Sequence, residues 1–143
     1  MFKNILVPIH LAYKKNHTKL FKGAFEVLDD DGKITLLYVN SNRTHGSVYP
    51  ILEDQNQVDY DKSALDAIKE IAIKHSLPMD KVSFKIKDGS AHNEILEESK
   101  KIDADAIVMM ATRPGLGSYF ISSTAERVIR HAACSVFVMR LDK

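Results

Sequence analysis

The stretch NILVPI, at residues 4–9, and the stretch AIVMM, at residues 106–110, decide the fold of this chain. Both are apolar throughout, without the alternation of apolar and polar residues that a strand with one face in water shows. Continuous apolar strands are typical of parallel sheets that helices cover on both faces. The two stretches are therefore expected to be buried strands of such a sheet.

Three further apolar runs predict strands, at residues 34–39, 82–86 and 135–140. Between the strands, apolar residues recur with the spacing of one helical face, within residues 20–28, 64–75, 95–102 and 125–132. The sequence DDDG at residues 29–32 is expected to form a turn into the second strand. Strict alternation of strands and helices indicates βαβ units with right-handed crossovers. We therefore predict an α/β fold with a doubly wound, five-stranded parallel sheet, in a single domain over residues 1–143.

The composition excludes several classes of protein. Twenty Lys and Arg residues balance nineteen Asp and Glu residues, for a formal net charge of +1. Nucleic acids and membrane surfaces usually need a dense basic face, so neither is an expected partner. The single Cys134 excludes an internal disulfide framework and suits a reducing compartment. No run approaches the roughly 18 apolar residues of a transmembrane helix, and the first ten residues are expected to form a strand and not a signal peptide. We therefore expect a cytoplasmic protein.

The loop ATRPGLGSYFISSTAER, at residues 111–127, is the first candidate for a site. It follows the strand at residues 106–110, and ligands of open α/β sheets collect beyond the carboxyl ends of the strands. Arg113 offers a guanidinium group, and Ser123 with Glu126 matches a capping box in which Ser123 would cap the last helix. The amide groups of such a helix start attract anions. Taken alone, the pattern leaves open whether the loop holds a phosphate or only connects a strand to a helix.

Other chemistry finds less support. The six histidines have no spacing typical of metal ligands, and the sequence contains neither a G-x-S-x-G nor a Walker pattern. We therefore predict no metal site and no catalytic residue. His10 follows the first strand at the expected crevice, where it is either a site residue or an ordinary surface histidine. His75 is expected to end a helix, where a positive charge is favoured.

Four stretches resemble landmarks of the universal stress protein family. They are NILVPI at residues 4–9, LLYVN at 36–40, DGSAHNEILEESKKIDADAIVMM at 88–110 and ERVIRHAACSVFVMR at 126–140. The resemblance covers nearly the whole chain and implies an adenine nucleotide alpha hydrolase-like sheet with the strand order 3-2-1-4-5. It also implies a homodimer that forms through the strand at residues 135–140. An isologous pairing would cover the apolar edge that this strand leaves exposed in a monomer.

Many members of the family bind ATP, so the resemblance implies an ATP site, with Mg²⁺ as a companion of the nucleotide. Carried over position by position, the base lies near Pro8, Ile9 and Val39, and the ribose near His10 and Met110. The phosphates lie near Arg113 and the start of the last helix. The full set of expected site residues is Pro8, Ile9, His10, Val39, Met109, Met110, Arg113, Ser122, Ser123 and Thr124.

The chain departs from the family pattern at four of these positions. Arg113 replaces a glycine that nucleotide-binding members with RP at this point also lack, and the other three departures weigh more. His10 stands where the family has an aspartate, and Met110 and Ser122 stand where it has glycines. The sequence therefore leaves two functions open. One is a regulatory protein that binds ATP and hydrolyses it slowly at most, since no carboxylate is identifiable for in-line attack. The other is a nucleotide-free dimeric stress protein that acts through protein partners.

Overall fold

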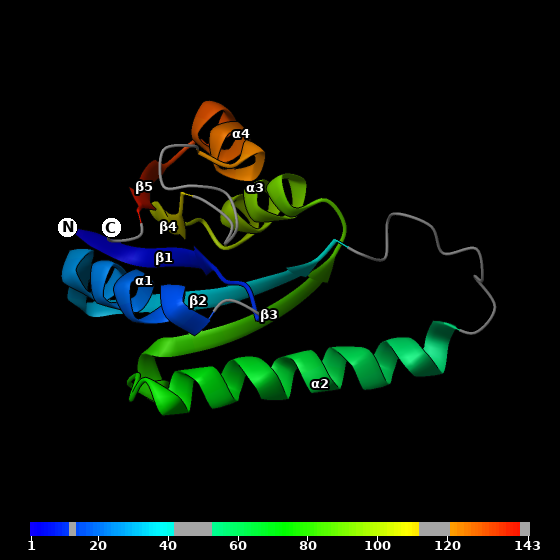
Figure 1. Cartoon of the computed structure of the whole chain (residues 1–143). Coiled ribbons are helices and arrows are strands. Elements are labelled where there is room, and N and C mark those ends of the chain that lie inside the picture. The colour runs from blue at the N-terminus through cyan, green and yellow to red at the C-terminus, as the bar shows by residue number, and fades with distance from the viewer. Residues whose placement is uncertain (12–13, 42–52, 112–120, 141–143) are drawn as a thin grey trace.

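The computed structural model of the chain describes residues 1–11, 14–41, 53–111 and 121–140 (Figure 1). Strands and helices alternate as predicted, and a short 3-10 helix, η2, precedes the third strand. In chain order the elements are β1 (Phe2–Pro8), α1 (Lys14–Val27), β2 (Leu28–Asn40), α2 (Glu53–Lys74), η2 (Met79–Lys81), β3 (Val82–Asp88), α3 (Ala91–Lys101), β4 (Ala106–Met110), α4 (Ser123–His131) and β5 (Ser135–Met139).

The five strands form one parallel sheet in the order β3-β2-β1-β4-β5, which confirms the predicted fold class. The strand order reverses direction between β1 and β4, so the loops that leave these two strands diverge to opposite faces. Helices α1 and α2 cover one face of the sheet, and α3 and α4 cover the other. The reversal creates the crevice at which a ligand site is expected.

The central strand β1 contributes side chains to the hydrophobic core on both faces of the sheet. Ile5 and Val7 are fully buried in the core on the side of α1 and α2, whereas Leu6 is fully buried on the side of α3 and α4. Successive side chains of a strand point to opposite faces, so a strand with helices on both sides must be apolar at every position. This explains why NILVPI and AIVMM lack alternation.

Strand β2 is longer than the sequence predicted. The expected turn at residues 29–32 is instead part of β2, which begins at Leu28. Phe2 pairs with Leu28, and after a register shift the pairing resumes at Asn4 and Lys33. Residues 29–32 therefore lie within β2, at a point where its register with β1 shifts. The composition of these four residues does not reveal such a shift.

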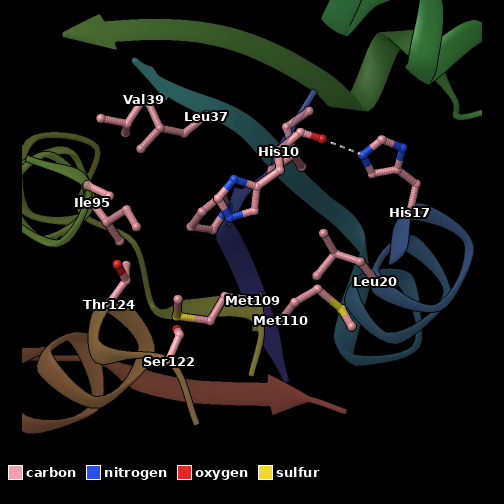
Figure 2. Close-up of a pocket in the computed structure, with 13 residues that line it drawn as sticks. His10, His17, Leu20, Leu37, Val39, Ile95, Met109, Met110, Ser122 and Thr124 are labelled. Atoms are coloured by element: carbon pink, nitrogen blue, oxygen red, sulfur yellow. Dashed lines mark hydrogen bonds between the residues drawn. The ribbon is translucent and has the colours of Figure 1, made fainter. Parts of the chain in front are cut away.

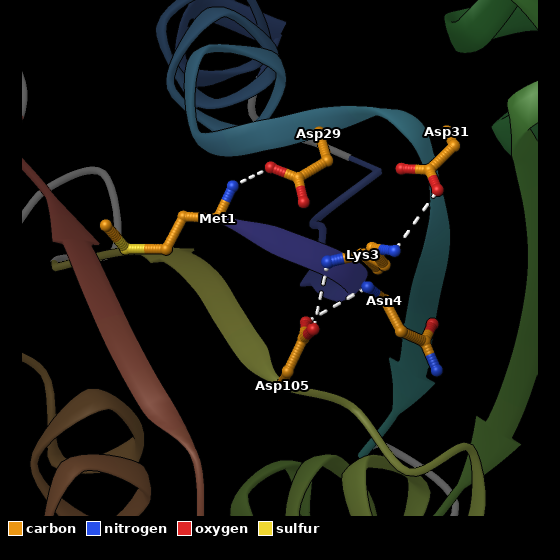
Figure 3. A network of polar contacts seen from close by, with 6 residues as sticks. All are labelled: Met1, Lys3, Asn4, Asp29, Asp31 and Asp105. Carbon is orange, nitrogen blue, oxygen red and sulfur yellow. Dashed lines mark hydrogen bonds and ion pairs between the residues drawn. The ribbon is translucent and has the colours of Figure 1, made fainter.

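Polar contacts fasten the amino-terminal end of β1 to its neighbours (Figure 3). The carboxylate of Asp105 accepts hydrogen bonds from the backbone N–H groups of Lys3, at 2.9 Å, and Asn4, at 3.0 Å. The N–H of Asp105 in turn donates to the carbonyl of Asn4 at 2.9 Å. On the other side of β1, Lys3 pairs with Asp31 at 3.2 Å and the terminal amino group pairs with Asp29. These contacts fix how β1 and β4 align, and hence where their carboxyl ends meet.

No helix in the described part of the chain is long and apolar enough to cross a membrane.

Candidate functional site

A pocket opens at the carboxyl ends of β1, β2 and β4, between α1 on one side and α3 and α4 on the other (Figure 2). Its empty space is about 650 Å³, open solvent at the mouth included. Six elements or the segments next to them contribute to its walls. The lining residues are Pro8, Ile9, His10, His17, Leu20, Leu37, Val39, Ala91, Ile95, Met109, Met110, Ser122 and Thr124.

All but two of the expected site residues line this pocket. The exceptions are Ser123, which begins α4 without lining the pocket, and Arg113, which lies outside the described residues. The ring of His10 lies in the middle of the lining side chains, although the residue as a whole is exposed. Whether these residues bind a ligand stays a prediction, but the structure brings them together in one cavity.

Five lining residues were not expected from the sequence. They are His17, Leu20, Leu37, Ala91 and Ile95. The last four are apolar, and the sequence alone cannot distinguish an apolar residue that lines a pocket from one that is buried in the core. His17 did carry a signal, because it precedes Leu20 and Phe21 by three and four residues and therefore shares the apolar face of α1.

His17 fixes the chain just after β1. Its side chain is only 2% exposed, and its Nε2 donates a hydrogen bond to the backbone carbonyl of His10 at 2.8 Å. The ring stacks on Phe21 at 5.8 Å between centroids and meets the ring of His75 edge-on at 6.0 Å. α1 thereby holds the backbone at His10, whose side chain lines the pocket two residues after the end of β1.

The prediction that His75 ends a helix is confirmed, because its N–H donates to the carbonyl of Ile71 in the last turn of α2, but the expected positive charge is corrected. The residue follows α2, but it packs against Phe21, with 5.2 Å between the ring centroids, instead of standing as a cation in solvent. Burial lowers the pKa of His75, and the nearby His17 and Lys74 lower it further. Burial also lowers the pKa of His17; Lys74 adds to this, against the opposing effect of the hydrogen bond to His10. Both rings therefore favour the neutral form.

Acid is expected to destabilise the protein through His17. Because its folded-state pKa lies below the unfolded value of about 6.5, its contribution to stability is complete above that pH and falls as the pH drops below it. The loss is at most about 1.4 kcal/mol per pH unit for one titrating histidine. Urea unfolding between about pH 7 and pH 5 measures it. His17→Gln keeps a donor for the His10 carbonyl and removes the titration, so its stability should vary less; an equal pH dependence would contradict the assignment.

The cap of α4 differs from the predicted one. Ser122, not Ser123, is the cap: its hydroxyl accepts from the N–H of Ala125 at 3.1 Å. Glu126 does not reach back, and instead pairs with Arg130 at 2.9 Å. The N–H of Ser122 donates to the carbonyl of Ala111 at 2.7 Å, so this buried serine ties the helix start to the end of β4. Among the described residues, no acceptor is found for the N–H groups of Ser123 and Thr124, the first two of the helix.

The chain that forms this pocket is similar to known proteins over nearly its whole length. A sequence model of the universal stress protein family matches residues 1–140. The chain belongs to this family. Universal stress protein G of Escherichia coli O157:H7 is 24% identical over 142 residues, covering 98% of this chain and 100% of that protein.

Solved structures share the fold of this universal stress protein. Hypothetical protein MJ0577 is 25% identical with a TM-score of 0.78, covering 100% of this chain and 99% of its own. Universal stress protein UspA from Lactobacillus plantarum is 23% identical with a TM-score of 0.67, covering 96% and 97%. The recognition made from the sequence motifs is thus confirmed over the length of the chain.

The chemistry of the pocket is that of an apolar cavity with a few polar groups. Its described lining contains no Asp or Glu, and its side chains with polar atoms other than sulfur are His10, His17, Ser122 and Thr124. Mg²⁺ prefers carboxylate, carbonyl and water oxygens. Among the described residues no group of three His, Cys, Asp or Glu could hold a metal ion. The described lining therefore does not fit a protein-held magnesium site.

Proposed function

We propose that this universal stress protein binds an adenine nucleotide in the pocket between β1 and β4 and acts as a regulatory protein. The observation that carries the proposal is the pocket itself, which lies at the reversal of the strand order and gathers most of the residues expected for a nucleotide site. A universal stress protein solved in complex with cAMP, 12% identical with a TM-score of 0.58, shares the fold. Pockets of this kind, apolar with a few convergent polar groups, are the usual sites of small ligands.

The nucleotide would lie across the carboxyl ends of the strands. The base would pack on Pro8, Ile9 and Val39, and the ribose would meet His10. The phosphates would approach Thr124 and the amides at the start of α4, where the helix dipole favours negative charge. Since the described lining offers no carboxylate, we expect the phosphates to be bound without a magnesium ion held by the protein.

Purified protein titrated with ATP, with and without magnesium, tests the proposal. A ligand at 100 times its dissociation constant stabilises the folded protein by about 2.7 kcal/mol, which raises the melting temperature by several degrees. Acid extraction followed by chromatography shows whether adenine nucleotide copurifies. Adenosine, which lacks the phosphates, separates the contribution of the base from that of the helix start. No copurifying nucleotide and no shift at millimolar ATP would remove the proposal.

The second candidate is a nucleotide-free homodimer, and the edge strand β5 favours a dimer in either case. β5 pairs with β4 on one side and ends the sheet on the other. Phe137 is only half-buried, although it packs against the core and meets the ring of Phe2 at 5.3 Å. A second β5 related by a two-fold axis would extend the sheet and cover this edge. Sedimentation equilibrium should give twice the monomer mass; a monomer at micromolar concentration would contradict the dimer.

A further inference from the structure

Helices α3 and α4 pack side by side (Figure 1). Both contribute to the wall of the pocket, and three basic side chains, those of His92, Arg127 and His131, lie near one another on these two helices. Arg127 of α4 places its guanidinium 3.5 Å from Nδ1 of His92 in α3. His131 follows Arg127 by one helical turn and also acts on the charge of His92. The hydroxyl of Ser90, the residue before α3, lies 3.0 Å from the same Nδ1.

The side chains of this cluster offer mainly hydrogen-bond donors: the guanidinium of Arg127, the hydroxyl of Ser90 and an N–H of His92. Arginine can only donate, so its contact with Nδ1 of His92 requires the tautomer in which Nδ1 accepts and Nε2 carries the ring proton. Ser90 is positioned as the cap of α3, but its side chain makes no cap hydrogen bond and turns to His92 instead. The guanidinium, the hydroxyl and the imidazole are thus directed at one another.

Three acidic side chains of α3 and α4 in the described part of the chain are directed away from the cluster. Glu126, beside Arg127 in sequence, is paired with Arg130 at 2.9 Å. Glu98 of α3 is buried near Lys87, with 3.8 Å between the charged atoms. Glu94 lies against the backbone of Gly89. Burial lowers the pKa of His92, and Arg127 and His131 lower it further, with no carboxylate opposing them.

We propose that Ser90, His92 and Arg127 form a binding site for a phosphoryl group. A phosphate seated between the two helices would accept from the guanidinium fork and from the hydroxyl, and from His92 once the imidazole is protonated. This site goes beyond the proposed function, because these three side chains would bind a phosphoryl group whether or not a nucleotide occupies the pocket. It also adjoins the pocket, since Ala91 of α3 and Thr124 of α4 line that cavity. The group can therefore come from a free phosphate or from a nucleotide bound in the pocket.

The imidazole of His92 reports on this site in the intact protein. The pH titration of its ring is followed by NMR in phosphate and in chloride at equal ionic strength, with His92→Gln to assign its signal among the six histidines. An anion favours the charged imidazole, so phosphate should raise the pKa of His92 by roughly half a unit or more. Arg127→Gln should abolish that rise. Arg130→Gln is the matched control on the same helix and should retain it.

Nucleotides distinguish the two sources of the phosphoryl group. If ATP moves the His92 signal and adenosine does not, the nucleotide supplies the group; if only inorganic phosphate moves it, the site takes a separate anion. A His92 titration that is the same in phosphate, ATP and chloride overturns the proposal. That outcome leaves nucleotide binding in the pocket untouched, because the melting temperature measures pocket binding independently. Arg127 is exposed, and a melting curve verifies that the Arg127→Gln variant folds. Arg127→Lys keeps the charge but loses the two-pronged guanidinium donor, so it should weaken the rise in the pKa of His92.

Discussion

Replacing Leu37 with alanine is expected to lower the free energy of unfolding by about 3 kcal/mol. Leu37 is fully buried and packs with Leu6, Ile95 and Met109 beneath α3 and α4. Truncation loses the transfer free energy of three carbon atoms and leaves a cavity that the sheet cannot close. The same side chain lines the pocket, so the variant also enlarges the cavity proposed for the nucleotide. Urea unfolding followed by circular dichroism measures the first effect.

Leu36→Ala is the matched control for this prediction. Leu36 is the neighbouring residue of β2 and is equally buried, but it packs in the core on the side of α1 and α2 and does not line the pocket. The two variants should lose similar stability, also about 3 kcal/mol for Leu36. Only Leu37→Ala should change the stabilisation by ATP. A cost below about 1 kcal/mol for Leu37 would contradict the packing described here.

The residues that were easiest to place from the sequence are those whose environment is simplest. Leu6 and Ile107 lie in strands that are buried on both faces, and such strands need only apolar side chains at every position. The order of strands and helices followed from the same pattern. Position 28 shows the limit of this reasoning. Leu28 had the spacing of the preceding helix, yet it begins β2, because its pairing with Phe2 depends on a strand far away in the sequence.

The position of the pocket could be predicted from the sequence, but the hydrogen bonds around it could not. The carboxyl ends of β1 and β4 could be placed from the expected topology, and with them Pro8 and Met110. The hydrogen bond from His17 to the His10 carbonyl could not, because it joins a helix face to a strand end through packing. The sequence predicted Ser123 as the cap, because it stands three residues before Glu126, and the structure has Ser122 instead. Both serines fit the preference for a cap, and only the backbone, extended at Ser122, decides between them.

These contacts give position 10 its particular importance. Its backbone is held by α1 through His17, while its ring stands among the lining residues of the pocket. A substitution there changes the chemistry offered to a ligand without removing the hydrogen bond that holds the backbone. It is therefore the most direct place to test what a carboxylate would add to the pocket, since the resemblance to the family implies an aspartate at this position.

His10→Asp is expected to tighten ATP binding in the presence of magnesium by about tenfold, the equivalent of one charge-assisted hydrogen bond of about 1.5 kcal/mol. The new carboxylate would accept from the ribose hydroxyls or bind the metal that accompanies the phosphates. Isothermal titration calorimetry of both proteins, with magnesium and with a chelator, measures the change. The chelator should reduce the gain to the extent that it depends on the metal.

His10→Asn separates charge from shape at the same position. Asparagine has the size of aspartate and can accept hydrogen bonds through its one carbonyl oxygen, but it carries no charge and is a weak ligand for magnesium. If the carboxylate matters, the asparagine variant should bind ATP much as the histidine protein does, and only aspartate should improve it. Equal gains in both variants would mean that the imidazole merely obstructs the ligand. Unchanged binding in both would place the ribose elsewhere in the pocket, because a group in contact with it cannot exchange imidazole for carboxylate without a change in affinity.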